Sequence, residues 1–163
     1  MPNHSILSIQ ELKTKGKTLE SYLEKTKSSW GDIIPKPLVQ PVIKNLSELL
    51  RQKECILLIF SAIWCKDCKL HLPEALSIKK VLSEKYQTDL EMIVFSGFKL
   101  DALNPDNRWK VPPSPPEAIH FDIFALPTFI LLEKATGKVL GRIEEHPKQK
   151  DSLEEELVVF LQN

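Results

Sequence analysis

The sequence has no excess of either charge, few cysteines and no apolar run long enough to cross a bilayer. Its 22 basic residues balance 22 acidic ones, which argues against nucleic-acid binding because no basic field would attract a polyanion. Residues 1–5 lack a basic region followed by an apolar core, so the sequence predicts neither a secretory signal nor a membrane span. We therefore expect a soluble protein that stays in the cytoplasm and contacts no membrane.

Three cysteines are too few for a framework of structural disulfides in a chain of 163 residues. Two of them, Cys65 and Cys68, are separated by two residues. In a reducing compartment such a close pair is more often redox-active or metal-binding than structural. We interpret the third, Cys55, as a small buried core residue at the start of a strand.

Hydrophobic periodicity predicts alternating helices and strands after a helical N-terminal third. An apolar run at 55–61 has no polar face, as expected of a central strand covered by helices on both sides. A second apolar run follows one helix later, so the two strands should be parallel. Residues 34–41 should hold no helix, because each proline restricts the residue before it. The expected elements are two short helices on either side of Gly16, a helix over 42–52, a strand over 55–61, a helix ending near Gln87, a strand over 90–96, a brief helix over 117–121, a hairpin of 129–132 with 139–143, and a helix starting at Asp151 or Ser152.

This order joins a βαβ unit to a ββα unit and predicts an α/β fold with a central mixed sheet and helices on both faces. A long proline-rich link, 97–120, connects the two units. The length fits a single domain, 1–163, in which 1–52 form a helical extension and 54–162 form the core.

Cys65 and Cys68 fall where an apolar strand passes into a helix. In the first helical turn, unpaired N–H groups and the positive end of the helix dipole favour a thiolate, so the pKa of Cys65 should be low. Cys68 lies one turn deeper and should be more buried, with a pKa closer to the ordinary thiol value. Between them, Lys66 should stabilise a thiolate and Asp67 should oppose it.

Residues 64–69 resemble the Trp-Cys-x-x-Cys-Lys motif of the thioredoxin superfamily. Pro73 stands where thioredoxins kink the active-site helix, and Leu-Pro-Thr at 126–128 stands where they carry Ile-Pro-Thr with a cis proline. The Trp-Cys-x-Asp-Cys form and residues 141–147 look like a bacterial and archaeal subgroup of small thioredoxin-like proteins with N-terminal helices. The resemblance covers about residues 54–162 and implies a thioredoxin-like fold.

The same resemblance implies a thiol–disulfide oxidoreductase that reduces protein or small-molecule disulfides without a cofactor. Cys65 would attack a substrate disulfide, and Cys68 would resolve the resulting mixed disulfide. Trp64, Leu126 and Pro127 would bind the substrate, whose extended backbone would pair with Leu126. An unidentified reductase would supply the electrons.

Two departures from the family pattern concern substrate and proton transfer. Thioredoxins carry a buried aspartate where this sequence has Ile59, so any help with proton transfer must come from elsewhere or from water. Glu144 stands where related proteins often have a glycine that lets substrate approach. Substrate range is therefore the property that the resemblance leaves most open.

Two other functions fit the same residues. The chain could be a non-catalytic thioredoxin-like module whose N-terminal helices or 97–120 link bind a partner. Cys65, Cys68 and His71 could also offer three ligands to a metal, but a structural zinc site normally needs four. We therefore expect no metal.

Overall fold

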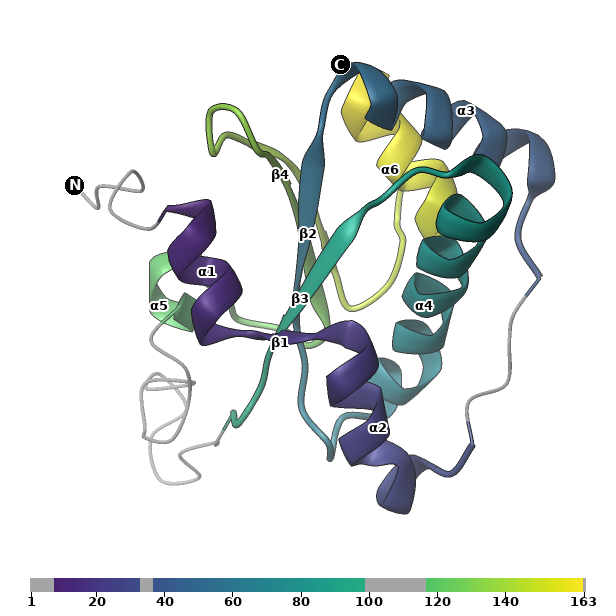
Figure 1. Cartoon of the computed structure of the whole chain (residues 1–163). Helices are drawn as coiled ribbons and strands as arrows, with labels where there is room; N and C mark the ends of the chain where they lie inside the picture. The colour runs from purple at the N-terminus through teal and green to yellow at the C-terminus, as the bar shows by residue number, and fades with distance from the viewer. Residues whose placement is uncertain (1–7, 33–36, 99–116, 163) are drawn as a thin grey trace.

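A computed structural model describes residues 8–32, 37–98 and 117–162 of the chain (Figure 1). These residues form a thioredoxin-like α/β fold, in which helices flank a five-stranded mixed sheet. The elements are, in order, α1 (Ile9–Lys15), β1 (Lys17–Thr18), α2 (Leu19–Trp30), α3 (Gln40–Gln52), β2 (Cys55–Phe60), α4 (Lys66–Tyr86), β3 (Glu91–Phe95), α5 (Glu117–His120), β4 (Thr128–Glu133), β5 (Val139–Glu144) and α6 (Leu153–Gln162).

The sheet has the strand order β1-β3-β2-β4-β5, with β2 at its centre. Strands β2 and β3 run parallel, with Phe60 opposite Phe95, which confirms the predicted crossover. Strands β4 and β5 form the predicted hairpin, and β4 pairs antiparallel with β2 so that Thr128 lies opposite Phe60. All six residues of β2 are buried, because β2 has a strand on each side and helices over both faces.

The helices form two layers, one on each face of the sheet (Figure 1). Helices α3, α4 and α6 contact one another on one face. Helix α1 and the short α5 lie on the other face. An ion pair connects these two helices, with Lys15 Nζ 3.7 Å from Glu117 Oε2. Helix α2 contacts β3 and α4, so that the N-terminal extension reaches the start of α4.

The two short helices around Gly16 are confirmed, and a short strand that the sequence analysis missed lies between them. This strand, β1, pairs antiparallel with β3 at Val94 and Ile93. A Cβ atom on Gly16 would lie 2.2 Å from Ile93 Cγ2, well inside van der Waals contact. Glycine at this position therefore lets the chain approach β3 closely enough to pair with it.

The start of α3 corrects one prediction. Residues 34–41 were expected to hold no helix, but α3 begins at Gln40 and contains Pro41 in its first turn. A proline is tolerated there because the N–H groups of the first turn have no acceptor within the helix. Of the other expected segments, residues 99–116 of the proline-rich link lie outside the described residues.

The C-terminal helix starts as the sequence predicts. The Ser152 hydroxyl accepts a hydrogen bond of 3.2 Å from the Glu155 N–H and donates one of 2.9 Å to the Glu155 carboxylate. Ser152 therefore supplies an oxygen acceptor to an amide of the first helical turn, as an N-cap residue does.

One cluster of buried side chains runs through the extension and the sheet. Leu12, Leu19 and Leu23 of the extension belong to the same cluster as the residues of β2. The extension therefore shares the hydrophobic core of the sheet. Among the described residues, no helix combines the length and the apolar character that crossing a bilayer requires.

Candidate active site

The two close cysteines lie where β2 passes into α4, as the sequence predicts. Cys65 is the N-cap of α4, and its Sγ accepts a hydrogen bond of 3.1 Å from the Cys68 N–H. A cysteine here takes the place that serine, threonine or aspartate usually fills at a helix start. Cys65 keeps 7% of its surface exposed and Cys68 keeps none, so Cys65 is the more accessible thiol.

The environment of Cys65 favours the thiolate. A hydrogen bond from the Cys68 thiol is the main cause that lowers the pKa of Cys65 to about 7, against the opposing effect of burial. The amide N–H groups of Cys68 and Asp67 lower this pKa further, and the Asp67 carboxylate raises it, as predicted. The stabilising effect of Lys66, which lies exposed in the first turn of α4, stays a prediction.

The environment of Cys68 favours the thiol. Burial raises the pKa of Cys68 far above its ordinary value, and the hydrogen bond with Cys65 adds to this effect. The Ser61 hydroxyl and the Ala62 amide lower it. Cys68 is more buried than Cys65, as predicted. The expectation that its pKa lies closer to the ordinary thiol value is wrong, because a sulfur without exposed surface bears the full cost of desolvation when it ionises.

Alkylation should distinguish Cys65 from Cys55. We expect the rate of Cys65 alkylation by iodoacetamide to follow a titration with a midpoint near pH 7, because only the thiolate reacts. Below that pH the rate should fall about tenfold for each pH unit, as protonation removes the thiolate. Cys55 is 2% exposed and burial raises its pKa to about 11, so it should stay unmodified. Peptide mass spectrometry reads out each site, and a Cys65 midpoint near 8.5, the ordinary thiol value, would contradict this assignment.

Hydrogen bonds from two tryptophans hold the loop that carries Cys65. Trp64 is 51% exposed, and its indole N–H donates to the Phe98 carbonyl at 3.2 Å. Trp30, the last residue of α2, donates its indole N–H to the Ile63 carbonyl at 2.8 Å. The loop is thereby attached both to the segment after β3 and to the N-terminal extension.

Leu126 and Pro127, which the resemblance assigns to substrate binding, directly precede β4. The peptide bond between them is cis. Because Thr128 lies opposite Phe60, Pro127 lies at the same end of the sheet as Ser61 and the cysteine loop. The Pro127 carbonyl accepts a hydrogen bond of 2.7 Å from the Glu145 N–H, which fixes this segment next to the end of β5.

Two further residues near the thiols were not identified from the sequence. Tyr22 of α2 and Ser61, which follows β2, form a buried hydrogen bond of 3.1 Å between their hydroxyl oxygens. The sequence places Tyr22 only within the second of the two short helices around Gly16, and Ser61 only at the end of the strand over 55–61. A hydroxyl directly after a buried strand, next to the cysteine motif, was the available signal; its partner lies 39 residues away in sequence.

The alternative metal site gains no support. Within the described residues, no group of three or more His, Cys, Asp and Glu side chains is placed to hold a metal ion. The third ligand considered, His71, has its Nδ1 3.2 Å from Glu74 Oε1 on the same helix.

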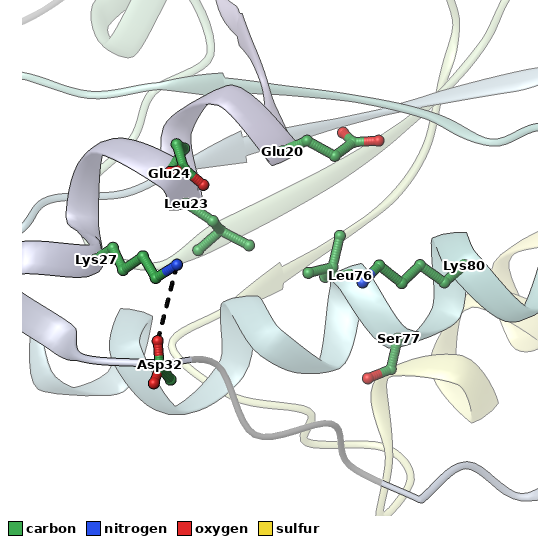
Figure 2. Close-up of a pocket in the computed structure, with 8 residues that line it drawn as sticks. All are labelled: Glu20, Leu23, Glu24, Lys27, Asp32, Leu76, Ser77 and Lys80. Atoms are coloured by element: carbon green, nitrogen blue, oxygen red, sulfur yellow. Dashed lines mark ion pairs between the residues drawn. The ribbon is translucent and has the colours of Figure 1, made fainter.

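Among the described residues, two hollows lie near the extension. One, of about 480 Å³ between α2 and α4, contains charges of both signs, with Lys27 and Asp32 paired at 3.8 Å (Figure 2). No cysteine lines it. The other, of about 440 Å³, adjoins the cysteine loop. Its lining residues are Lys17, Tyr22, Lys25, Thr26, Ala62, Ile63, Trp64, Ser96, Gly97 and Phe98.

Fold and site together define a thioredoxin-like α/β protein with a Cys-x-x-Cys pair at a strand-to-helix junction. No protein-family model matches the chain, and no curated protein matches it in sequence. A solved protein of unknown function from Pseudomonas aeruginosa is similar in fold, with a TM-score of 0.56 and 16% identity over 96% of each chain. An HIV epitope scaffold has a TM-score of 0.50 and 14% sequence identity, over 96% of this chain and 94% of the scaffold chain. A chain in a complex of ferredoxin:thioredoxin reductase and thioredoxin f2 has a TM-score of 0.40 and 21% sequence identity. The match covers 79% of this chain and 89% of that chain.

Proposed function

We propose that this protein is a cytoplasmic thiol–disulfide oxidoreductase of the thioredoxin superfamily. It reduces protein or small-molecule disulfides through Cys65 and Cys68. The observation that supports this most directly is the pairing of an accessible sulfur at the helix start with a buried thiol one turn away, which lowers the pKa of Cys65 to about 7. At neutral pH about half of Cys65 is then ionised and able to attack a disulfide.

The reaction transfers two electrons from the dithiol to the substrate. The Cys65 thiolate attacks a substrate disulfide RS–SR′, forms the mixed disulfide Cys65–S–S–R and releases R′S⁻. Cys68 then loses its proton and attacks Cys65 Sγ, so that the Cys65–Cys68 disulfide forms and RS⁻ leaves. The Cys68 proton ends on the departing thiolate as RSH. A dithiol donor must return the Cys65–Cys68 pair to its reduced form.

Substrate binding fits the apolar surface beside the thiols. Ile63 and Trp64 are about half exposed, at 48% and 51%, although both are large apolar side chains. Trp64, Leu126 and Pro127 are the proposed contacts for the substrate, with Leu126 pairing through its backbone. The reducing direction follows from the proposed compartment, because the cytosolic thiol pool keeps such a pair reduced.

Reduction of insulin by dithiothreitol tests the proposal. We expect the protein to make the freed insulin B chain precipitate several times faster than dithiothreitol alone, because the Cys65 thiolate attacks the insulin disulfides first. Turbidity measures the rate, and heat-denatured protein is the control. A rate equal to that of dithiothreitol alone would favour the alternative function, a non-catalytic thioredoxin-like binding module.

A further inference from the structure

Two buried hydroxyl groups, those of Ser61 and Tyr22, lie near the thiol that resolves the mixed disulfide, Cys68. Ser61 has no exposed surface and Tyr22 has 5%, and their hydroxyl oxygens are 3.1 Å apart. The Ser61 N–H donates to the Phe95 carbonyl at 3.0 Å, which continues the pairing of β2 with β3 and fixes the Ser61 backbone. Each hydroxyl of this buried pair therefore has a hydrogen-bond partner, as burial of a polar group requires.

Ser61 connects this pair to Cys68. The Cys65 N–H donates to the Ala62 carbonyl at 3.1 Å and the Cys68 N–H donates to Cys65 Sγ at 3.1 Å, so a tight turn joins the segment of Ser61 and Ala62 to Cys68. In this turn the Ser61 hydroxyl and the Ala62 backbone N–H act on Cys68 and lower its pKa. Both groups stabilise the ionised form of Cys68, in contrast to burial, which disfavours it. They are thus placed where negative charge develops when Cys68 gives up its proton.

Either hydroxyl of the Tyr22–Ser61 pair can donate to the other while Tyr22 is protonated. Burial raises the pKa of Tyr22 to about 12, against the lowering effect of the hydrogen bond with Ser61, so Tyr22 keeps its proton at neutral pH. A serine hydroxyl has one proton and two lone pairs. When the Ser61 proton points to Cys68, the Tyr22 proton points to the Ser61 oxygen, and the series of donors ends at sulfur.

We propose that Ser61 is a catalytic hydrogen-bond donor that stabilises the Cys68 thiolate during resolution, and that Tyr22 is the residue that positions it. The proposal rests on the proposed oxidoreductase function and adds a role for the N-terminal extension. In the resolution step, Cys68 Sγ loses its proton, forms the bond to Cys65 Sγ and displaces RS⁻, which takes up the proton. Ser61 and Tyr22 keep their own protons throughout and neither acts as a base.

The extension holds Tyr22 in place through contacts outside the thiols. The Tyr22 ring packs edge-to-face on Trp30 with ring centroids 6.0 Å apart, and Trp30 in turn bonds to the Ile63 carbonyl. Helix α2 thus contacts the cysteine loop at two points, Ser61 and Ile63. The extension takes part in the reaction by orienting a donor.

The two chemical steps can be followed separately with the chromogenic disulfide dithiobis(nitrobenzoate). In stopped-flow absorbance at neutral pH, attack by Cys65 releases a first equivalent of thionitrobenzoate at a rate that rises with reagent concentration. Resolution by Cys68 releases a second equivalent at a rate independent of that concentration. Cys68→Ser should release the first equivalent only, which assigns the phases.

Ser61→Ala should slow the second phase by about 10- to 100-fold, the range expected for losing a hydrogen bond to a charged group, and change the first phase by less than about twofold. Tyr22→Phe should slow the second phase by about three- to tenfold, because Ser61 keeps its proton but loses its orientation. Ser61→Thr, which keeps the hydroxyl, should restore the second phase to near the wild-type rate.

Matched controls separate this role from general damage to the fold. Ser47 has no exposed surface and donates to the Lys44 carbonyl, so Ser47→Ala removes a buried hydroxyl in α3, away from the thiols. Tyr86→Phe makes the second control, at the last residue of α4. Both variants should keep wild-type rates in both phases, and thermal unfolding should show that all variants fold.

Three results would overturn the proposal. They are an unchanged second phase in Ser61→Ala or in Tyr22→Phe, equal slowing of both phases, and equal slowing by the control variants. If Ser61→Ala fails to fold, the rate of the second phase in Tyr22→Phe alone decides whether the proposal holds. A wild-type protein that releases no second equivalent would instead refute the proposed oxidoreductase function, so the two failures can be told apart.

Discussion

Cys65→Ser is expected to lower the rate of disulfide reduction by at least about a thousandfold. The physical reason is ionisation: the pKa of Cys65 is lowered to about 7, whereas a serine hydroxyl stays protonated at neutral pH. Cys68→Ser should stop turnover too, but at a different point. Its Cys65 still attacks, so the enzyme should accumulate as a mixed disulfide with the substrate. Insulin turbidity measures turnover, and the intact mass detects the trapped complex.

Cys55→Ser is the matched control for both variants. Cys55 lies at the start of β2, is 2% exposed and has a pKa raised to about 11 by burial. Its replacement should leave the turnover within about twofold of the wild type, since a buried neutral thiol is chemically inert. A Cys65→Ser variant that kept substantial activity, or a mixed disulfide formed through Cys68 in that variant, would contradict the assigned order of attack.

Phe60→Ala is expected to lower the free energy of unfolding by about 3–5 kcal/mol. Phe60 ends the central strand and has no exposed surface. Its ring stacks on Phe95 with centroids 5.3 Å apart and lies 6.3 and 5.9 Å from the rings of Phe98 and Phe121. Truncation would leave a cavity among three aromatic rings that β3 and the following segments hold in place. Urea denaturation followed by circular dichroism measures the loss.

Phe124→Ala is the control for this stability effect. Phe124 is 54% exposed and has Arg142 over its ring at 6.0 Å, so its replacement should cost less than about 1 kcal/mol. A loss in Phe60→Ala no larger than in this control would mean that the four rings do not form a packed cluster in solution.

The central part of the fold could be predicted because its signals are local. Six consecutive apolar residues made β2 recognisable, and the intervening helix required β3 to run parallel. The hairpin of β4 and β5 and the Ser152 helix start were equally readable, since turn residues and capping residues lie within a few positions of each other.

The elements that were missed depend on tertiary contacts. Strand β1 has only two residues, Lys17 and Thr18, which is too short to show alternation, and it exists because it pairs with β3. The start of α3 was placed too late because proline was treated as a helix breaker without regard to its position in the first turn.

The site was predictable in its residues but not in its energetics. The Cys65–Cys68 spacing identified the thiols, and the helix start indicated which one would be the more acidic. The high pKa of Cys68 depends on complete burial, and the Tyr22–Ser61 bond joins residues 39 positions apart. Neither property has a signature along the chain, because both depend on contacts between segments that are distant in sequence.

The short strand β1 also bears on how the molecule behaves when concentrated. Without it, β3 would present unsatisfied backbone groups between mainly apolar side chains, which is the template on which a second chain adds and aggregates. β1 occupies part of that template with two exposed residues, one of them a lysine, and is itself too short to recruit another chain. The segment before α2 therefore covers part of the β3 edge of the sheet against intermolecular strand addition.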